Sequence, residues 1–210
     1  YVSFANCGLP YYVGNVIEQE DKLLVATPAL FKNRFRIDVR TGTEVVAIDR
    51  GAGEVEVREL ATGRTYRERY DALVLAPGAA PLVPPLPGLA LPGGFTLRPL
   101  PASRKIREWI AEKKPRRAVL VGAGFIGLEM AENLVHRGLS VSIVEMADQV
   151  MPPLDPELAT TVADWLTSKG LDLRLGEALA GIEVGKAGLE VKTRAGTVLA
   201  ADMVVLGLGV

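Results

Sequence analysis

Cysteine and histidine are almost absent, because the 210 residues include only one of each. A single thiol excludes an internal disulfide and a CxxC metal site, and a single imidazole excludes a histidine-rich metal centre. Thiol redox chemistry within the chain therefore depends on Cys7. No apolar run reaches the roughly 20 residues that span a membrane, and no secretory signal sequence opens the chain. From these absences we expect a cytoplasmic protein with no membrane partner.

An excess of positive charge is also missing, since 24 Lys and Arg residues stand against 25 Asp and Glu residues. Proteins that bind a nucleic-acid backbone need a basic surface, so we expect no nucleic-acid partner. The 49% of apolar residues are enough for one large core or two small ones. These proportions favour a globular protein that binds a small molecule.

Proline is concentrated in one region, with eight of the fourteen prolines between Pro77 and Pro101. Such a stretch carries neither a helix nor a central strand, so it predicts a linker between two domains, residues 1–100 and 101–210. The pattern behind the linker alternates strands and helices. It predicts strands at 118–121, 141–144, 171–175 and 203–210, helices at 125–137 and 155–169, and a small antiparallel meander near 180–184, 189–193 and 197–200.

The first half repeats part of this order, with strands near 44–49, 55–60 and 65–69 followed by an apolar strand at 70–76. Asp71 to Gly78 aligns with Asp202 to Gly209. The second copy opens at Val119, 83 residues before Asp202, and the same spacing places the opening strand of the first copy before Tyr1. We therefore expect an α/β fold of two Rossmann-like nucleotide-binding modules, each with a parallel sheet and an antiparallel meander, the first module being incomplete.

The strongest motif is Gly122-Ala-Gly124-Phe-Ile-Gly127, which lies between a predicted strand and a predicted helix. The three glycines allow a tight turn, close approach of a pyrophosphate and packing of the helix on the sheet. Glu145 ends the next strand 18 residues later and is placed to accept both ribose hydroxyls of an adenosine. The motif predicts dinucleotide binding at Gly122, Gly124, Phe125, Ile126, Gly127 and Glu145. No arginine closely follows Glu145 to hold a 2′-phosphate, which favours NADH over NADPH.

Cys7 has two interpretations. A lone cysteine is most often a small buried hydrophobe. Here Asn6 is a suitable N-cap and Pro10 fits only a first turn, which predicts a helix N-terminus at Cys7, where the helix dipole favours thiolate over thiol. His136 falls in the last turn of a predicted helix and needs no catalytic role. The alternating Lys32, Arg34 and Arg36 are typical of a solvated face and are left out of the site.

Several segments together resemble the pyridine nucleotide-disulfide oxidoreductases, and among them the coenzyme A-disulfide reductases. The matching segments are Ser3-Phe-Ala-Asn-Cys-Gly-Leu-Pro-Tyr-Tyr12, Arg36–Val39, Glu44–Asp49, Leu75–Gly78 and the glycine motif. Members of this family have an FAD domain, an inserted NAD domain and a C-terminal dimerisation domain. The resemblance covers essentially the whole chain. It implies FAD and NAD(P)H as cofactors, a homodimer, and a chain without the FAD glycine loop and the dimerisation domain.

The resemblance also implies roles for individual residues. Hydride passes from NADH to FAD, and the electrons then reduce a disulfide between Cys7 and coenzyme A. With one cysteine, the CxxxxC dithiol cycle is excluded. Pro77 stands where many relatives have threonine, so that side chain offers no hydroxyl contact. The implied contacts are Ser3 and Asn6 for the coenzyme A thiol, Val45, Ala76, Pro77 and Gly78 for FAD, and Glu129 and Gly209 for the nicotinamide end of NADH.

Other functions remain open at this point. Cys7 of an NADH oxidase or peroxidase would cycle through a sulfenic acid. A polysulfide or coenzyme A-persulfide reductase would use the same cysteine for another sulfur substrate. The 210-residue chain by itself is also consistent with an NAD-binding fragment without catalysis.

Overall fold

The computed structural model describes residues 1–209, so the last residue of the strand predicted at 203–210 lies outside the described residues. The chain falls into two units, which we describe separately. The small unit comprises residues 1–4 and 24–79, and the large unit comprises residues 5–23 and 80–210. The predicted boundary at residue 100 concerns cofactor binding and stays a prediction. None of the helices in the described part of the chain is long and apolar enough to cross a membrane.

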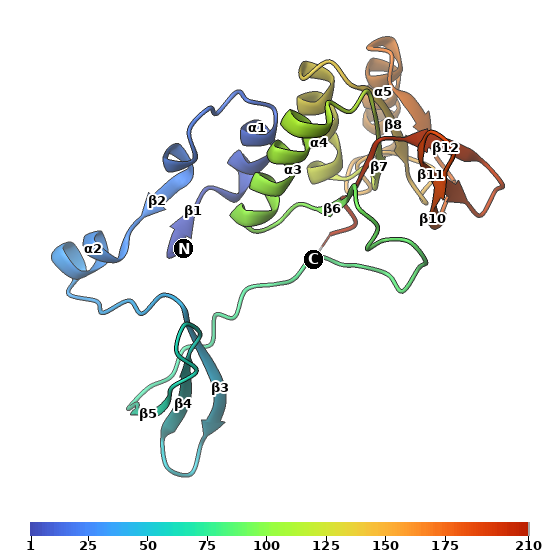
Figure 1. Cartoon of the computed structure of the whole chain (residues 1–210). Coiled ribbons are helices and arrows are strands. Elements are labelled where there is room, and N and C mark those ends of the chain that lie inside the picture. Colours follow the sequence, from blue (N-terminus) through green and yellow to red (C-terminus); the bar gives the residue numbers. More distant parts are fainter. Residues whose placement is uncertain (210) are drawn as a thin grey trace. The chain divides into compact units, whose positions relative to one another are not determined.

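A parallel sheet of five strands forms the centre of the large unit (Figure 1). The strand order is β6-β13-β7-β8-β9. All four residues of β13 are buried because it lies between two other strands, whereas β6 forms an edge and tolerates the neighbouring prolines. The strands are β6 (Gly94–Thr96), β7 (Arg117–Val121), β8 (Ser140–Val144), β9 (Asp172–Arg174) and β13 (Met203–Leu206).

Three longer helices accompany this sheet: α3 (Leu100–Lys113), α4 (Phe125–His136) and α5 (Pro156–Ser168). The predictions of α4 and α5 are confirmed. Gly138 follows α4 with φ 83°, a conformation that ends a helix at little cost for glycine. The sequence did not predict α3, which begins inside the proline-rich region. Pro101 is allowed there because it occupies the first turn, where a missing N–H breaks no helical bond.

The predicted meander is confirmed as the antiparallel strands β10 (Leu179–Gly185), β11 (Gly188–Thr193) and β12 (Val198–Ala201). Its apolar side chains share one core with the parallel sheet, where Ile182 and Val191 pack with Val119 and Val204. Each such side chain, when fully buried, contributes about 1.5–3 kcal/mol to stability. The meander is thus fixed against the strands that carry the glycine motif.

Residues 5–23 pack against α3 and α4 through the short helix α1 (Leu9–Val13). The turns η1 (Asn6–Gly8) and η2 (Glu20–Leu23) flank α1. Arg104 of α3 donates two hydrogen bonds to Glu20 at 2.8 and 2.6 Å, and the Arg107 guanidinium lies 4.1 Å from the ring centroid of Tyr12. These contacts fix the segment that carries Cys7 to the large unit.

The small unit contains a second antiparallel meander, β3 (Thr43–Asp49), β4 (Glu54–Glu59) and β5 (Thr65–Arg69), as predicted. It also contains the pair β1 (Ser3–Phe4) and β2 (Leu24–Ala26), followed by α2 (Pro28–Leu30) and η3 (Phe31–Phe35). The two meanders have the same strand order, in agreement with the internal repeat.

The strand predicted at 70–76 is wrong, because residues 73–80 have no regular structure. The aligned segment of the large unit, β13, lies between β6 and β7 and pairs with both. Within the described residues of the small unit, no strand pairs with residues 72–76, and Val74 is 87% exposed. An apolar sequence alone does not form a strand when its backbone has no partner.

Candidate functional site

The three glycines of the motif lie in a turn between β7 and α4. Gly122 has φ 106°, in the region that favours glycine. A Cβ on Gly127 would lie 2.0 Å from the carbonyl oxygen of Gly122, so only glycine allows α4 to approach the turn this closely. A Cβ on Gly124 would meet no atom within 4 Å. The turn therefore leaves open space at the N-terminus of α4, where backbone N–H groups and the helix dipole favour a phosphate.

A cavity of about 680 Å³ extends along this turn, and we call it the glycine-loop cavity. Its volume lies within the range of small-molecule and cofactor sites, about 300–1,000 Å³. Gly127 packs against the carbonyl of Gly122 and does not line the cavity. The predicted dinucleotide residues that line it are Gly122, Gly124, Phe125, Ile126, Glu145 and Gly209.

Glu145 is held in place by two backbone donors. Its Oε2 accepts a hydrogen bond from the N–H of Ala123 at 2.7 Å, and its Oε1 accepts one from the N–H of Ala147 at 2.8 Å. Each carboxylate oxygen has a further lone pair, so Glu145 retains capacity to accept hydroxyl donors. The side chain thus orders the glycine turn and also presents acceptors to the glycine-loop cavity.

A second cavity, of about 220 Å³, contains Cys7, and we call it the thiol cavity. It brings Asn6 and Cys7 of one segment together with Glu129 of another, three residues for which the family resemblance implies roles in the site. Sequence reasoning missed Arg98, which also lines this cavity and follows β6 closely. The one signal for Arg98 was a basic residue after a short apolar run in the proline-rich region. Ile126 lines both cavities, so they share this residue as part of their walls.

The N-cap predicted at Asn6 is wrong. A 3₁₀ turn begins at Asn6, its N-cap residue is Ala5, and no side chain caps it. Pro10 lacks an N–H and therefore occupies the first turn of α1, which places the start of that helix at Leu9 and leaves Cys7 in the preceding turn. The thiol is exposed, which contradicts the interpretation of Cys7 as a buried hydrophobe.

Glu129 lines the thiol cavity, and its surroundings change the pKa of its carboxyl group. Burial raises the pKa of its carboxyl group, and the negative charge of Glu132 raises it further. Both effects disfavour the charged form, so Glu129 keeps its proton to a higher pH than an exposed glutamate. A carboxyl group with a raised pKa beside a cysteine is a suitable proton donor or acceptor.

The residues assigned to FAD belong to the small unit. Val45 lies on β3 with 54% of its surface exposed, at an irregularity in the pairing with β4. Ala76, Pro77 and Gly78 are exposed and irregular, and Gly78 has φ 74°. Ser3 is paired with Ala26 in this unit, whereas Asn6 belongs to the large unit. The roles of these residues in FAD and coenzyme A binding stay predictions.

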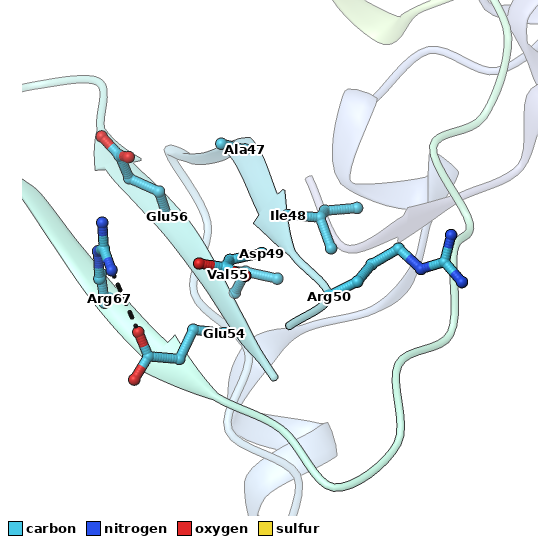
Figure 2. A pocket seen from close by; sticks show the side chains of 8 residues that line it. All are labelled: Ala47, Ile48, Asp49, Arg50, Glu54, Val55, Glu56 and Arg67. Carbon is cyan, nitrogen blue, oxygen red and sulfur yellow. Dashed lines mark hydrogen bonds and ion pairs between the residues drawn. The ribbon is translucent and has the colours of Figure 1, made fainter. Parts of the chain in front are cut away.

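The small unit has a cavity of about 440 Å³ on its meander, but none of the predicted site residues lines it (Figure 2). Three of its charged side chains have partners within the protein: Arg67 pairs with Glu54 at 3.5 Å, and Asp49 accepts the N–H groups of Gly51 and Ala52. Arg50 extends away from the other side chains in Figure 2. The site is therefore best sought in the two cavities of the large unit.

Comparison with known proteins identifies relatives over the whole chain. The family model described as "Pyridine nucleotide-disulphide oxidoreductase" matches residues 2–210. An NADH oxidase of Methanocaldococcus jannaschii is 37% identical over 210 residues, which are 100% of this chain and 46% of that protein. A coenzyme A disulfide reductase of Staphylococcus epidermidis is 35% identical and is matched over 99% of this chain and 46% of its own length. The chain thus spans about half the length of the curated relatives it matches.

Solved structures agree with this result. Reduced CoADR-RHD of Bacillus anthracis is 44% identical, with a TM-score of 0.95 over 100% of this chain and 37% of that chain. A NAD-dependent persulfide reductase from A. fulgidus is 36% identical, with a TM-score of 0.92 over 100% of this chain and 39% of that chain. The predicted α/β fold with a parallel sheet and antiparallel meanders is confirmed. The glycine motif, the fold and the match over residues 2–210 show that the chain belongs to the pyridine nucleotide-disulphide oxidoreductase family.

Proposed function

We propose that the chain contributes the dinucleotide site and the redox cysteine of an NAD(P)H-dependent flavoprotein that reduces coenzyme A disulfide. The observation that carries this proposal is a shared wall residue: Ile126 borders both the glycine-loop cavity and the thiol cavity. A reductant bound at Gly122–Gly127 and a thiol at Cys7 then lie in cavities that share this residue. The resemblance between the chain and coenzyme A disulfide reductases supports the choice of disulfide.

The residues present fit a dinucleotide at the glycine turn. Open space above Gly124 admits the pyrophosphate, and the N–H groups at the start of α4 bind it. Glu145 orients the adenosine ribose and, as a carboxylate, favours NADH over NADPH. Glu129 faces the nicotinamide end from the first turns of α4.

FAD, when bound, carries the two electrons from the nicotinamide to the disulfide. The small unit would contact it through the backbone of Val45 and the turn Ala76–Gly78. Among the described residues of the small unit, no strand, glycine turn and helix follow one another as they do at residues 117–136. The fit of the small unit to FAD is therefore partial.

Cys7 performs the exchange with substrate. Its thiolate attacks one sulfur of coenzyme A disulfide, the S–S bond of the substrate breaks, and one coenzyme A thiolate leaves. Two electrons from NADH then break the mixed disulfide, which releases the second coenzyme A thiolate and restores the Cys7 thiolate. Asn6 borders the thiol, and Glu129 is placed to hold or supply a proton in the same cavity. The net change is NADH, a proton and coenzyme A disulfide to NAD⁺ and two coenzyme A thiols.

The exchange step can be tested on the 210-residue chain alone, because it needs no flavin. Incubation with coenzyme A disulfide should release about one equivalent of coenzyme A per chain and leave the other half on Cys7, as measured by intact mass. Cys7→Ser is the matched control and should show neither product. A wild-type chain that stays unmodified under these conditions would contradict the proposed substrate.

An NADH oxidase or peroxidase is the second candidate, favoured by the 37% identity to a protein of that name and by the exposure of Cys7. In that function hydrogen peroxide converts the Cys7 thiolate to a sulfenic acid. Dimedone traps sulfenic acids. Rapid dimedone labelling of Cys7 after peroxide, with slow reaction towards coenzyme A disulfide, would favour this candidate. The homodimer implied by the family is a further proposal, which sedimentation of the full-length protein would test.

A further inference from the structure

Arg194 lines the glycine-loop cavity together with Glu145, although the two residues are far apart in the sequence. The meander brings them together. Arg194 follows the end of β11, and its backbone N–H donates to the carbonyl of Ala178 at 2.8 Å. The N–H of Glu177 in turn donates to the carbonyl of Glu145 at 2.9 Å. Two backbone hydrogen bonds therefore join the segments of Glu145, Glu177 and Arg194 at one end of the cavity.

The two carboxylates at this end are engaged within the protein. Glu145 accepts the N–H groups of Ala123 and Ala147. Glu177 accepts a hydrogen bond from the Thr193 hydroxyl at 2.8 Å. The hydroxyls of Thr197 and Thr193 lower the pKa of Glu177, which keeps it ionised at neutral pH.

Arg194 differs from these carboxylates. It is exposed, and within residues 1–209 its guanidinium forms no ion pair with either carboxylate or with any other acidic group. Its five N–H donors in a rigid fork match a phosphate monoester, and such bidentate contacts are among the stronger hydrogen bonds in proteins. The positive charge of Arg194 in the wall of the glycine-loop cavity offsets the electrostatic repulsion between the Glu145 carboxylate and a phosphate on the ribose.

We propose that Arg194 binds the 2′-phosphate of NADPH, so that the cavity accepts NADPH as well as NADH. This inference rests on the proposed dinucleotide site. Glu145 places the adenosine ribose at its own end of the cavity, and the ribose 2′-oxygen carries the phosphate. The absence of an arginine directly after Glu145 in the sequence is compensated by Arg194 from the turn between the second and third strands of the meander.

The experiment is calorimetric titration of the 210-residue chain with NADH and NADPH, and with the smaller pair adenosine 5′-monophosphate and adenosine 2′,5′-bisphosphate. The variants are Arg194→Ala and Arg194→Lys. Lys186→Ala is the matched control, because Lys186 is an exposed cation of the same meander that does not line the cavity.

For the wild-type chain we expect the Kd values of NADPH and NADH to differ by about tenfold or less. Arg194→Ala should raise the Kd of NADPH and of the bisphosphate by about tenfold or more, and it should change the Kd of NADH by less than about twofold. Arg194→Lys should have an intermediate effect. Added salt should weaken NADPH binding more than NADH binding in the wild type, and this difference should shrink in Arg194→Ala. Lys186→Ala should behave as the wild type.

Three results would overturn the inference. If Arg194→Ala binds NADPH as tightly as the wild type, Arg194 does not contact the phosphate. An equal loss for NADH and NADPH would instead indicate stacking on the adenine. A wild-type chain that binds NADH but not NADPH would also refute it, whereas failure to bind either nucleotide would refute the proposed dinucleotide site itself.

Discussion

Asp202 and Arg117 are joined by four hydrogen bonds. Oδ2 of Asp202 accepts the backbone N–H of Arg117 at 2.9 Å and its Nε at 3.5 Å, Oδ1 accepts from Nη2 of the guanidinium at 2.6 Å, and the N–H of Asp202 donates to the carbonyl of Arg117 at 2.9 Å. The backbone N–H of Arg116 is a further donor, also at 2.9 Å from Oδ2. These contacts tie the start of β13 to the start of β7, the strand that leads into the glycine turn. They fix the relative register of two central strands.

The pKa of Asp202 should make this contact dependent on pH. The Arg117 side chain, and then the two backbone N–H groups, lower that pKa against the opposing effect of burial. A lowered folded-state pKa stabilises the fold above the unfolded value near 3.9, and the contribution is lost as pH falls through the folded value. Asp202→Asn should cost about 1 kcal/mol at pH 7, a modest figure because the Arg117 side chain is 38% exposed.

Urea unfolding of wild type and Asp202→Asn between pH 7 and pH 3 measures this difference, which should narrow at the acidic end. Asp164→Asn, an exposed change on α5, serves as the control and should be neutral. A difference that stays constant over the whole pH range would show that the carboxylate charge is not the cause.

Gly124 and Gly127 should respond differently to the same substitution. Gly124→Ala places a Cβ in open space, so the free energy of unfolding should hardly change, but the methyl group takes up room needed by the pyrophosphate. Gly127→Ala places a Cβ 2.0 Å from the Gly122 carbonyl and should cost about 1–3 kcal/mol in stability. Thermal unfolding and NADH titration of both variants test the pair. Unchanged NADH affinity of Gly124→Ala would contradict the assignment of Gly124 to the ligand.

Glu145→Ala should weaken NADH binding by about tenfold. The ribose hydroxyls lose their hydrogen-bond acceptor, and the N–H groups of Ala123 and Ala147 lose the carboxylate that accepts from them. It should also reduce the preference for NADH over NADPH. Titration with both nucleotides provides the measurement, and Glu157→Ala on α5 is the control. Unchanged affinity and preference would remove Glu145 from the site.

The chain should retain little FAD on purification. The glycine turn at residues 122–127 is the one strand–turn–helix phosphate site in the described residues, and we assign it to NADH. The absorbance near 450 nm, compared with the protein absorbance, gives the flavin content. A yellow chain with about one FAD per polypeptide would show that the contacts around Val45 and Gly78 are sufficient without a further phosphate site.

Local patterns predicted the large unit well, because β7, α4 and β8 are marked by apolar runs, glycines and a terminal acid in one short stretch. The failures arose where distant residues decide the outcome. The strand predicted at 70–76 did not form because no described strand pairs with it. The helix α3 was not predicted because its first residues lie in the proline-rich region, although the first turn of a helix tolerates proline. Arg98 and Arg194 reach the two cavities from segments that the motif does not include.

Ile126 forms part of the wall of both the glycine-loop cavity and the thiol cavity. A side chain packed between two spaces cannot change rotamer in response to one occupant without changing the shape offered to the other. Coupling free energies are reciprocal. If a dinucleotide in the glycine-loop cavity changes the affinity of a ligand for the thiol cavity by some factor, that ligand changes the affinity of the dinucleotide by the same factor. Coupling that passes through this one aliphatic residue of α4 requires no movement of the sheet.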